Sequence, residues 1–267
     1  MNIKIEDRRK SKITFSLKLA SGLIFIAGLG LGLLTLASAA GIWLGLWDFR
    51  RGFTLLGTAN DYGDLIALAC LGLTLCVSLA SQLFKIDHAG KLVGMAAAGT
   101  LIAAVAYYIP ESFRPPEGVN YPPIHDISTD TLSPPKFIAI LPLRADAANT
   151  VVYGGSTNMT AEKLAQATRE AYPDLVTQRY NATRAETFAK ALAAVQQLGW
   201  ELVAAVPEEG RIEATDTTLW FRFKDDIVIK IEQQGNQSIV NARSVSRVGT
   251  GDVGANAIRL RAFFALL

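Results

Sequence analysis

Hydrophobic and polar positions divide the chain into two regions. Three long runs without a charged residue occupy the first part, at 19–47, 65–84 and 92–109. A hydrocarbon core about 30 Å thick needs roughly 20 apolar residues of helix, and a single span must satisfy its backbone polar groups internally. The pattern predicts three transmembrane helices that form a membrane anchor over 1–110. A signal peptide is the alternative for the first run, but that run is too long and two more follow it.

Glycines spaced four apart predict close packing between the membrane helices. They are Gly28 with Gly32 and Gly41 with Gly45, a spacing that lets helix backbones approach each other. No run carries an ionised residue in its middle, so packing is favoured over transport. The connection 48–64 mixes charged, aromatic and aliphatic residues, which is typical of a segment in the headgroup layer. Docking on the soluble region is the other interpretation of that connection.

Lysine and arginine residues predict the orientation of the anchor. Eight stand before the first run or between the second and third, and three stand on the other side: Lys4, Arg8, Arg9, Lys10, Lys12, Lys18, Lys85 and Lys91 against Arg50, Arg51 and Arg114. Positive residues tend to stay cytoplasmic. We therefore expect a cytoplasmic amino terminus, and in a bacterium a multi-pass inner-membrane protein with a periplasmic carboxyl-terminal domain. Both cysteines, Cys70 and Cys76, lie in the second run, so the exported part has no disulfide.

A proline-rich segment separates the anchor from the globular region. Prolines stand at 110, 115, 116, 122, 123, 134 and 135. Proline removes a backbone donor and disfavours helix at the residue before it. The sequence predicts an extended, mostly irregular segment over 111–143, here called the strap. Such a length without regular structure is unusual inside a domain, so we expect the strap to lie across the folded part or to act as a spacer.

The remaining residues, 144–267, predict a soluble α+β domain. Thr160 begins a helix that Pro173 stops, and Thr183 with Glu186 forms a capping box for a second helix ending near Gly199. Alternating apolar positions predict strands at 200–206, 211–217, 219–223, 227–232 and 238–248, and Asp252 caps a last helix. These elements predict an antiparallel sheet with helices on one face.

The tripeptide Lys224-Asp225-Asp226 is a test of this strand assignment. On the phase of Phe223 and Ile227, Asp225 would point into the core, where an unpaired carboxylate is costly. Either the chain turns at the tripeptide or Asp225 is buried with an arginine partner. We favour the turn, because Lys-Asp-Asp suits one.

Several blocks of residues resemble a known family. They are Pro122-Pro123-Ile124-His125-Asp126-Ile127-Ser128-Thr129-Asp130, Ile212-Glu213-Ala214-Thr215, Phe223-Lys224-Asp225-Asp226 and Arg243-Ser244-Val245-Ser246-Arg247-Val248-Gly249, followed by Asp252, Gly254, Asn256 and Ala257. In this order, over about 121–264, they resemble the domain-of-unknown-function family numbered 1499. The resemblance implies no particular activity or ligand. It implies membrane spans in bacterial members and an association with thylakoids in plant relatives.

Two arginines of the last strand suggest a binding site for an anion or a partner. Arg243 and Arg247 share one face of that strand and stand close to a helix start whose free amides favour negative charge. The candidate site comprises Arg243, Arg247, Asp252, Asn256, Arg259, His125, Asp126, Asp225 and Asp226. In the alternative interpretation, which we favour, the arginines pair with aspartates of the strap or sheet and are structural.

Catalysis has weaker support than binding. A hydrolase would have to use His125 with Asp225 or Asp226, because the exported region holds no cysteine and a single histidine. Gly249-x-Gly251-x-x-Gly254 matches a dinucleotide fingerprint, but no parallel strand and no acidic residue follow it at the required distance. A net charge of +2 gives no indication of nucleic-acid binding. We expect a non-catalytic binding or assembly module, without cofactor or metal, that grips a partner protein, lipid headgroup or envelope polymer.

Overall fold

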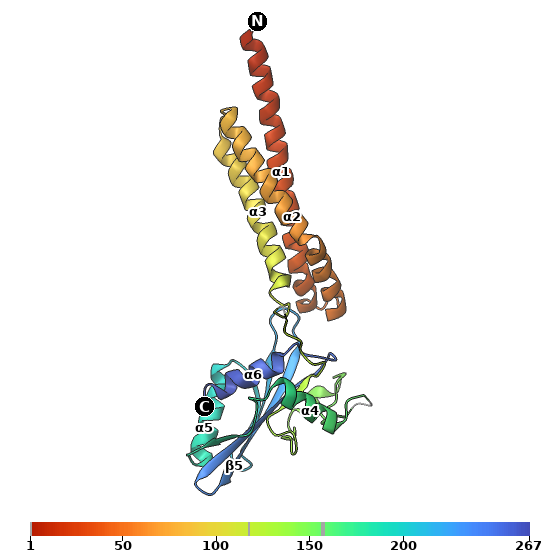
Figure 1. Ribbon diagram of the computed structural model, residues 1–267, viewed down its shortest axis with the longest axis vertical. Helices are drawn as coiled ribbons and strands as arrows, with labels where there is room; N and C mark the ends of the chain where they lie inside the picture. The colour runs from red at the N-terminus through yellow and green to blue at the C-terminus, as the bar shows by residue number, and fades with distance from the viewer. Residues whose placement is uncertain (1, 117, 156–157) are drawn as a thin grey trace. The chain divides into compact units, whose positions relative to one another are not determined.

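The computed structural model of the protein describes residues 2–116, 118–155 and 158–267, with side chains from Glu6 onward. The chain divides into two compact units, Met1–Arg114 and Pro115–Leu267. Each unit has a hydrophobic core of its own. The first unit consists of helices and the second contains the sheet (Figure 1).

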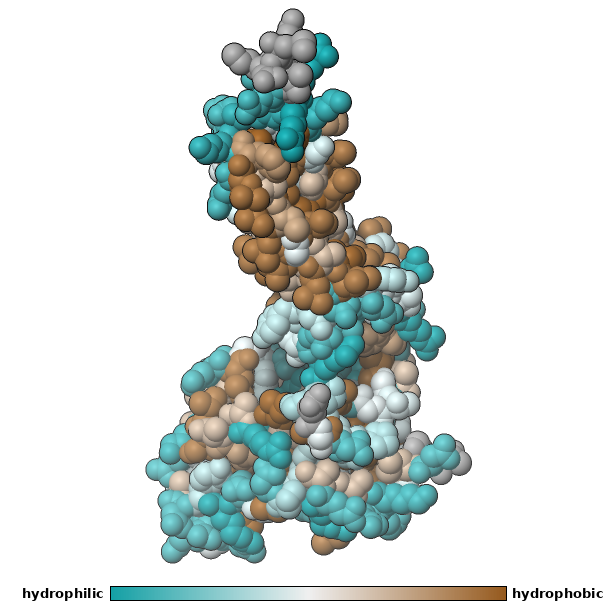
Figure 2. Space-filling view, turned by 45° about the horizontal axis from the view of Figure 1, so that its top comes forward, coloured by the Kyte–Doolittle hydropathy of each residue, from teal (hydrophilic) through white to brown (hydrophobic). Residues whose placement is uncertain are grey.

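The first unit is a bundle of three long helices, α1 (Asn2–Trp43), α2 (Phe49–Leu83) and α3 (Ala89–Glu111). All three are long and apolar enough to cross a membrane. Their apolar side chains form a continuous band, with hydrophilic residues gathered at the end that carries the amino terminus (Figure 2). The connection 48–64 is helical from Phe49 and continuous with the second apolar run, and Asp48 caps this helix by accepting from the Arg51 amide at 3.0 Å.

One glycine pair brings two helix backbones of the bundle into contact. A Cβ atom placed on Gly28 would lie 2.0 Å from the carbonyl oxygen of Gly99, and one on Gly32 would lie 2.8 Å from the Ile102 side chain. Any larger side chain at Gly28 would therefore separate α1 from α3. The packing role expected for this pair agrees with the structure.

The second glycine pair shapes a turn instead of a helix contact. Gly45 follows the end of α1 with φ +68°, a left-handed conformation that glycine adopts without steric cost. The turn folds the Trp47 ring over Gly41, where a Cβ atom would lie 1.9 Å from the ring. The close-packing prediction is wrong for this pair, because α1 ends between the two glycines.

The second unit is built on an antiparallel sheet of six strands in the order β1-β6-β5-β4-β3, with β2 also paired to β6. The strands are β1 (Asp126–Ser128), β2 (Gln178–Tyr180), β3 (Glu201–Val206), β4 (Arg211–Thr217), β5 (Lys224–Gln234) and β6 (Gln237–Ser246). Strand β6 pairs with β5 along one side and with β1 and β2 along the other. The α+β fold class with an antiparallel sheet is confirmed. The two short strands β1 and β2 lack the alternation that would have predicted them.

Helices cover one face of this sheet. They are α4 (Ala161–Ala171), α5 (Arg184–Gln197) and α6 (Ala255–Phe264), and Figure 1 shows α5 and α6 lying along the sheet. Aliphatic residues of β4, β5 and β6 meet Phe188, Leu260 and Phe263 in a fully buried core. The capping box of Thr183 and Glu186 is present at the start of α5. Local sequence signals thus suffice to place the helices.

The strap covers the opposite face of the sheet. Beyond the end of α3 at Glu111, and apart from β1 and a 3-10 turn at Leu141–Arg144, the described residues of the strap are irregular. Phe137 and Ile140 pack against Val228 and Val245, whose side chains point away from the helices because neighbours in a strand face opposite sides. The strap therefore lies on the folded domain.

Two predictions about the β4–β5 connection are wrong. Residues 219–223 form a turn and not a strand: the Thr218 amide donates to the Phe223 carbonyl at 2.8 Å, and Arg222 has φ +57°. The tripeptide 224–226 is the start of β5 and not a turn. Asp225 and Asp226 are both buried there. The rejected alternative, a buried Asp225 with an arginine partner, describes the structure, as its contacts show.

Candidate functional site

Arg243 is enclosed by the strap. Its guanidinium donates to both oxygens of Asp126, with Nε–Oδ1 at 2.8 Å and Nη2–Oδ2 at 2.7 Å. Further donors reach the carbonyls of Pro135 and Val151. The rings of Phe137 and Tyr153 each lie 5.3 Å from the guanidinium carbon, a distance at which a cation is attracted to an aromatic ring.

Both partners of this pair are buried, so the pair joins strap and sheet from the inside. Arg243 is 2% exposed and Asp126 is 4% exposed. Burial and the charge of Asp126 also raise the pKa of the Tyr153 hydroxyl to about 12. Tyr153 therefore stays neutral at physiological pH and serves as a ring against the guanidinium.

Asp226 connects Arg144, which directly follows the strap, to the strap side of the sheet. It is fully buried and accepts from Nε and Nη2 of Arg247, both at 2.9 Å, from the Thr215 hydroxyl at 2.7 Å, and from Arg144. Burial lowers the pKa of Arg144, although the charge of Asp226 opposes that shift. Arg144 also donates to the Asn149 carbonyl at 3.0 Å. One carboxylate thus holds two guanidinium groups.

Glu213 holds the strap through its backbone. Its carboxylate is completely buried and accepts from three consecutive amides, those of Ile138, Ala139 and Ile140, at 2.9–3.1 Å. Arg211 pairs with the same carboxylate from the neighbouring end of β4. Irregular backbone has no ladder to satisfy its amides, and here a side chain of the sheet satisfies them.

A separate polar cluster lies on the helix side of the sheet. Asp225 faces α6 and pairs with Arg259 at 2.7 Å, and Arg259 also reaches Asp216 at 2.8 Å. The Ser244 hydroxyl contacts the amide oxygen of Asn256 at 2.6 Å, and the Asn256 amide nitrogen donates to the Ser246 hydroxyl and to the His125 carbonyl. This cluster connects α6 to β5, β6 and the strap.

Asp252 caps the turn that leads into α6. Its side chain accepts from the amides of Gly254 and Asn256, both at 2.9 Å, although Gly254 occupies the N-cap position itself. Burial raises the pKa of the Asp252 carboxyl. Asp252 therefore caps the helix start from two residues before the N-cap position.

The structure distributes the nine candidate residues over separate clusters. On the strap side lie Asp126, Asp226, Arg243 and Arg247; on the helix side lie Asp225, Asp252, Asn256 and Arg259, with His125 contributing its backbone carbonyl. Within the described residues, Arg243, Arg247 and Arg259 each have a carboxylate partner. These pairs are the ones that the structural interpretation expected: Arg243 pairs with Asp126 of the strap, and Arg247 pairs with Asp226 of the sheet.

Sequence reasoning missed Glu213 and Arg144, which hold the strap most directly. Glu213 stands among apolar residues in the middle of β4, and a carboxylate at such a position indicates a buried partner. Arg144 stands between the strap and the sheet domain, and no pattern in the sequence indicates that its side chain is buried.

The geometry does not gather the groups that a hydrolase would need. Asp225 and Asp226 are neighbours in β5, so their carboxylates point to opposite faces of the sheet, and each is occupied by arginine. Nδ1 of His125 is buried and accepts no hydrogen bond from the described residues. No group of three potential metal ligands occurs in the described part of the chain.

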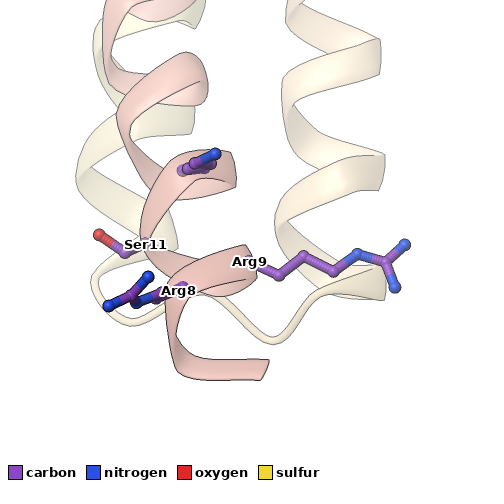
Figure 3. Close-up of a pocket in the computed structure, with 4 residues that line it drawn as sticks. Arg8, Arg9 and Ser11 are labelled. Carbon is purple, nitrogen blue, oxygen red and sulfur yellow. The ribbon is translucent and has the colours of Figure 1, made fainter. Parts of the chain in front are cut away.

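The first unit has a hollow at its amino-terminal end, lined by Arg8, Arg9, Ser11 and Lys12 (Figure 3). The side chains of Arg8 and Arg9 leave the helix on different sides (Figure 3). Nearby, Lys10 pairs with Asp87 of the α2–α3 connection at 3.2 Å. The hollow is cationic and open, and its arginines do not converge on one ligand.

Comparison with known families shows to which family the second unit, Pro115–Leu267, belongs. The family described as "Protein of unknown function (DUF1499)" matches residues 126–267. The chain belongs to this family. The match begins at Asp126, in β1, and covers Arg144, Glu213, Asp226 and Arg243. The buried pairs that hold the strap thus lie inside the DUF1499 region, and the helical bundle lies outside it.

A comparison with curated proteins finds no match for this chain. The resemblance of the motif blocks to DUF1499 is confirmed. The family description assigns no activity.

Proposed function

We propose that this chain is a membrane-anchored, non-catalytic binding or assembly module that binds a partner protein through its second unit, Pro115–Leu267, here called the soluble unit. The main support is that the strap is fixed on the sheet along its inner side and exposes apolar residues along its outer side. Buried charges fix its inner side through Glu213, Asp226 and Arg243, while its outer side carries large aliphatic residues. A rigid segment that displays apolar side chains suits recognition, because little conformational freedom is lost on binding.

The outer strap surface consists of Ile138, Leu141 and Leu143. Their exposed fractions are 53%, 46% and 54%, whereas Phe137 and Ile140 between and beside them are buried. Exposed apolar residues that are grouped on one segment are typical of interaction sites. A protein partner with an apolar surface fits them better than a polar envelope polymer or a charged headgroup.

We place this module on the periplasmic side of a bacterial inner membrane. Support comes from the eight lysines and arginines on the amino-terminal side of the three helices against three on the other side. An alkaline phosphatase fused to the carboxyl terminus should be active in cells. An inactive fusion, together with a fluorescent green fluorescent protein fusion, would reverse the orientation.

The partner interaction is tested by in-cell crosslinking of the full-length chain. We expect the Ile138→Asp/Leu143→Asp variant to lose the crosslinked species that the natural chain forms, because charges on the outer strap surface oppose an apolar contact. Val176→Asp is the matched control, since Val176 is 50% exposed and lies outside the strap. Equal crosslinking in all three proteins would refute the proposed surface, and near-ultraviolet circular dichroism shows that each variant is folded.

A further inference from the structure

Two loops lie together at one end of the sheet, where the strap enters the soluble unit. The β4–β5 loop (residues 218–223) precedes Lys224, and the β6–α6 loop (residues 247–254) follows Ser246; Asp225 and Ser246 are paired, and the Arg247 amide donates to the Lys224 carbonyl at 3.0 Å. These two loops are called the apical loops.

The strap passes against the second apical loop. The Asp252 amide donates to the Ile124 carbonyl at 3.1 Å, and a Cβ atom on Gly254 would lie 2.4 Å from the Tyr121 ring. Nine residues lie between Glu111, the last residue of α3, and Tyr121, and the ten Cα-to-Cα steps span at most about 35 Å when extended. The apical loops are therefore at the end of the sheet that a short chain connects to the membrane anchor.

The apical loops expose apolar side chains there. Leu219 is 72% exposed and Val253 is 51% exposed. Next to Leu219 stand the half-buried Trp220 and the exposed cation Arg222. Tryptophan, an aliphatic residue and arginine in one short loop are typical of a segment at a membrane interface, where the ring and the long cationic side chain have one apolar and one polar part.

Two residues of the apical loops have a backbone conformation that carries a steric cost. Val253 has φ +52° and Arg222 has φ +57°. A β-branched residue is rarely found in this left-handed region, and such strain concentrates at functional positions. Phe221 is buried and its ring lies 5.6 Å from that of Phe223, which anchors the first loop from the inside.

We propose that the apical loops insert into the interfacial layer of the lipid bilayer, with Leu219 and Val253 entering the acyl boundary and Arg222 meeting lipid phosphate. We favour the bilayer over a protein partner for two reasons. The three helices are long and apolar enough to cross a membrane, and the chain that connects them to the apical loops is short. Insertion would hold the soluble unit against the membrane surface and leave the strap face available. The inference does not depend on the proposed partner at the strap.

Site-specific quenching tests insertion in the full-length chain. Cys70→Ala/Cys76→Ala provides a background without other thiols. Leu219→Cys, Val253→Cys and the control Asn236→Cys each receive an environment-sensitive fluorophore in nanodiscs of phosphatidylcholine and phosphatidylglycerol. Asn236 is exposed at the opposite end of β5, about 35 Å away at the usual rise per residue.

We expect lipids with a spin label near the headgroup to quench most of the fluorescence at positions 219 and 253 and little at 236. Equal, weak quenching at all three positions would overturn the proposal. A blue-shifted emission at 219 without lipid quenching would overturn it too, in favour of a protein contact. If one labelled variant is misfolded by circular dichroism, the other reports on the same surface. Loss of strap crosslinking leaves these results unchanged, so the two proposals fail separately.

Discussion

The two faces of the sheet are covered by different means. On one face, helices satisfy their own backbone hydrogen bonds and contribute apolar side chains to a continuous core. On the other face, the irregular strap has no regular ladder of its own: the buried carboxylate of Glu213 accepts from three of its amides, and Arg243 donates to its Pro135 carbonyl. The difference shows that an irregular segment can cover a sheet when charged side chains replace the hydrogen bonds of a helix.

The largest expected effect is the loss of the carboxylate that holds three strap amides. Glu213→Ala should lower the free energy of unfolding by about 3–5 kcal/mol, because it leaves three strap amides without a partner and removes the buried one of the two carboxylates that pair with Arg211. Glu209→Ala is the control: Glu209 also pairs with Arg211 but is half exposed, so its loss should cost clearly less than the loss of Glu213. Thermal unfolding of the full chain in detergent measures both, and similar costs would contradict the role of Glu213.

The ion pair between Asp126 of the strap and Arg243 of the sheet should show a strong coupling free energy in unfolding. Asp126→Leu and Arg243→Met each leave one buried charge alone, with an expected loss of about 3–5 kcal/mol. The double variant removes both charges and should be clearly more stable than the sum of the single losses predicts. Additive losses, determined by the same unfolding measurement, would mean that the two side chains act independently.

Neighbouring aspartates on opposite faces permit a direct comparison. Asp226→Asn weakens the contact to two arginines at once, whereas Asp225→Asn leaves Arg259 with its second partner, Asp216. We expect the strap-side substitution to destabilise the protein by about 1–3 kcal/mol more than the helix-side one. An equal or reversed order in thermal unfolding would show that the two faces depend equally on charge.

The smallest expected effect concerns the helix face at acid pH. Hydrogen bonds from the backbone and side chain of Thr183 lower the pKa of Glu186 below its usual value of 4.5. The ionised carboxylate therefore stabilises the fold at neutral pH, and this contribution is lost as the pH falls through the lowered pKa. Glu186→Gln retains the capping geometry without the titration.

Thermal midpoints of the natural chain and Glu186→Gln should differ slightly at neutral pH and converge in acid, as the pH falls through the lowered pKa of Glu186 and its carboxylate becomes protonated. A constant difference from neutral to acid pH would exclude a contribution from Glu186 titration.

The helix face could be predicted from the sequence because its signals are local. Thr160 and the capping box at Thr183 mark helix starts by rules that involve only four consecutive residues, and the alternation in β4 and β6 assigns the sheet faces. The three apolar helices follow from length and composition alone. The motif blocks gave the family for the same reason, since they are continuous stretches of sequence.

The strap face could not be predicted in full because its contacts join distant residues. Asp226 meets Arg144 from 82 positions away, and Glu213 meets the Ile138 amide from 75 positions away. Without Arg144 as partner of Asp226 and Arg259 as partner of Asp225, the tripeptide 224–226 resembles a turn. The aromatic turn after Thr217 resembles a strand. Burial of charge depends on a partner that only the tertiary fold supplies.

Strand β6 sets the order in which this domain can form during synthesis. It is the shared neighbour of β1, β2 and β5, and all three precede it in the chain. Until residue 246 has emerged, the strap residues that were made more than a hundred positions earlier have no strand to pair with. Contacts of such separation form slowly, so the sheet should be completed only after β6 has been synthesised.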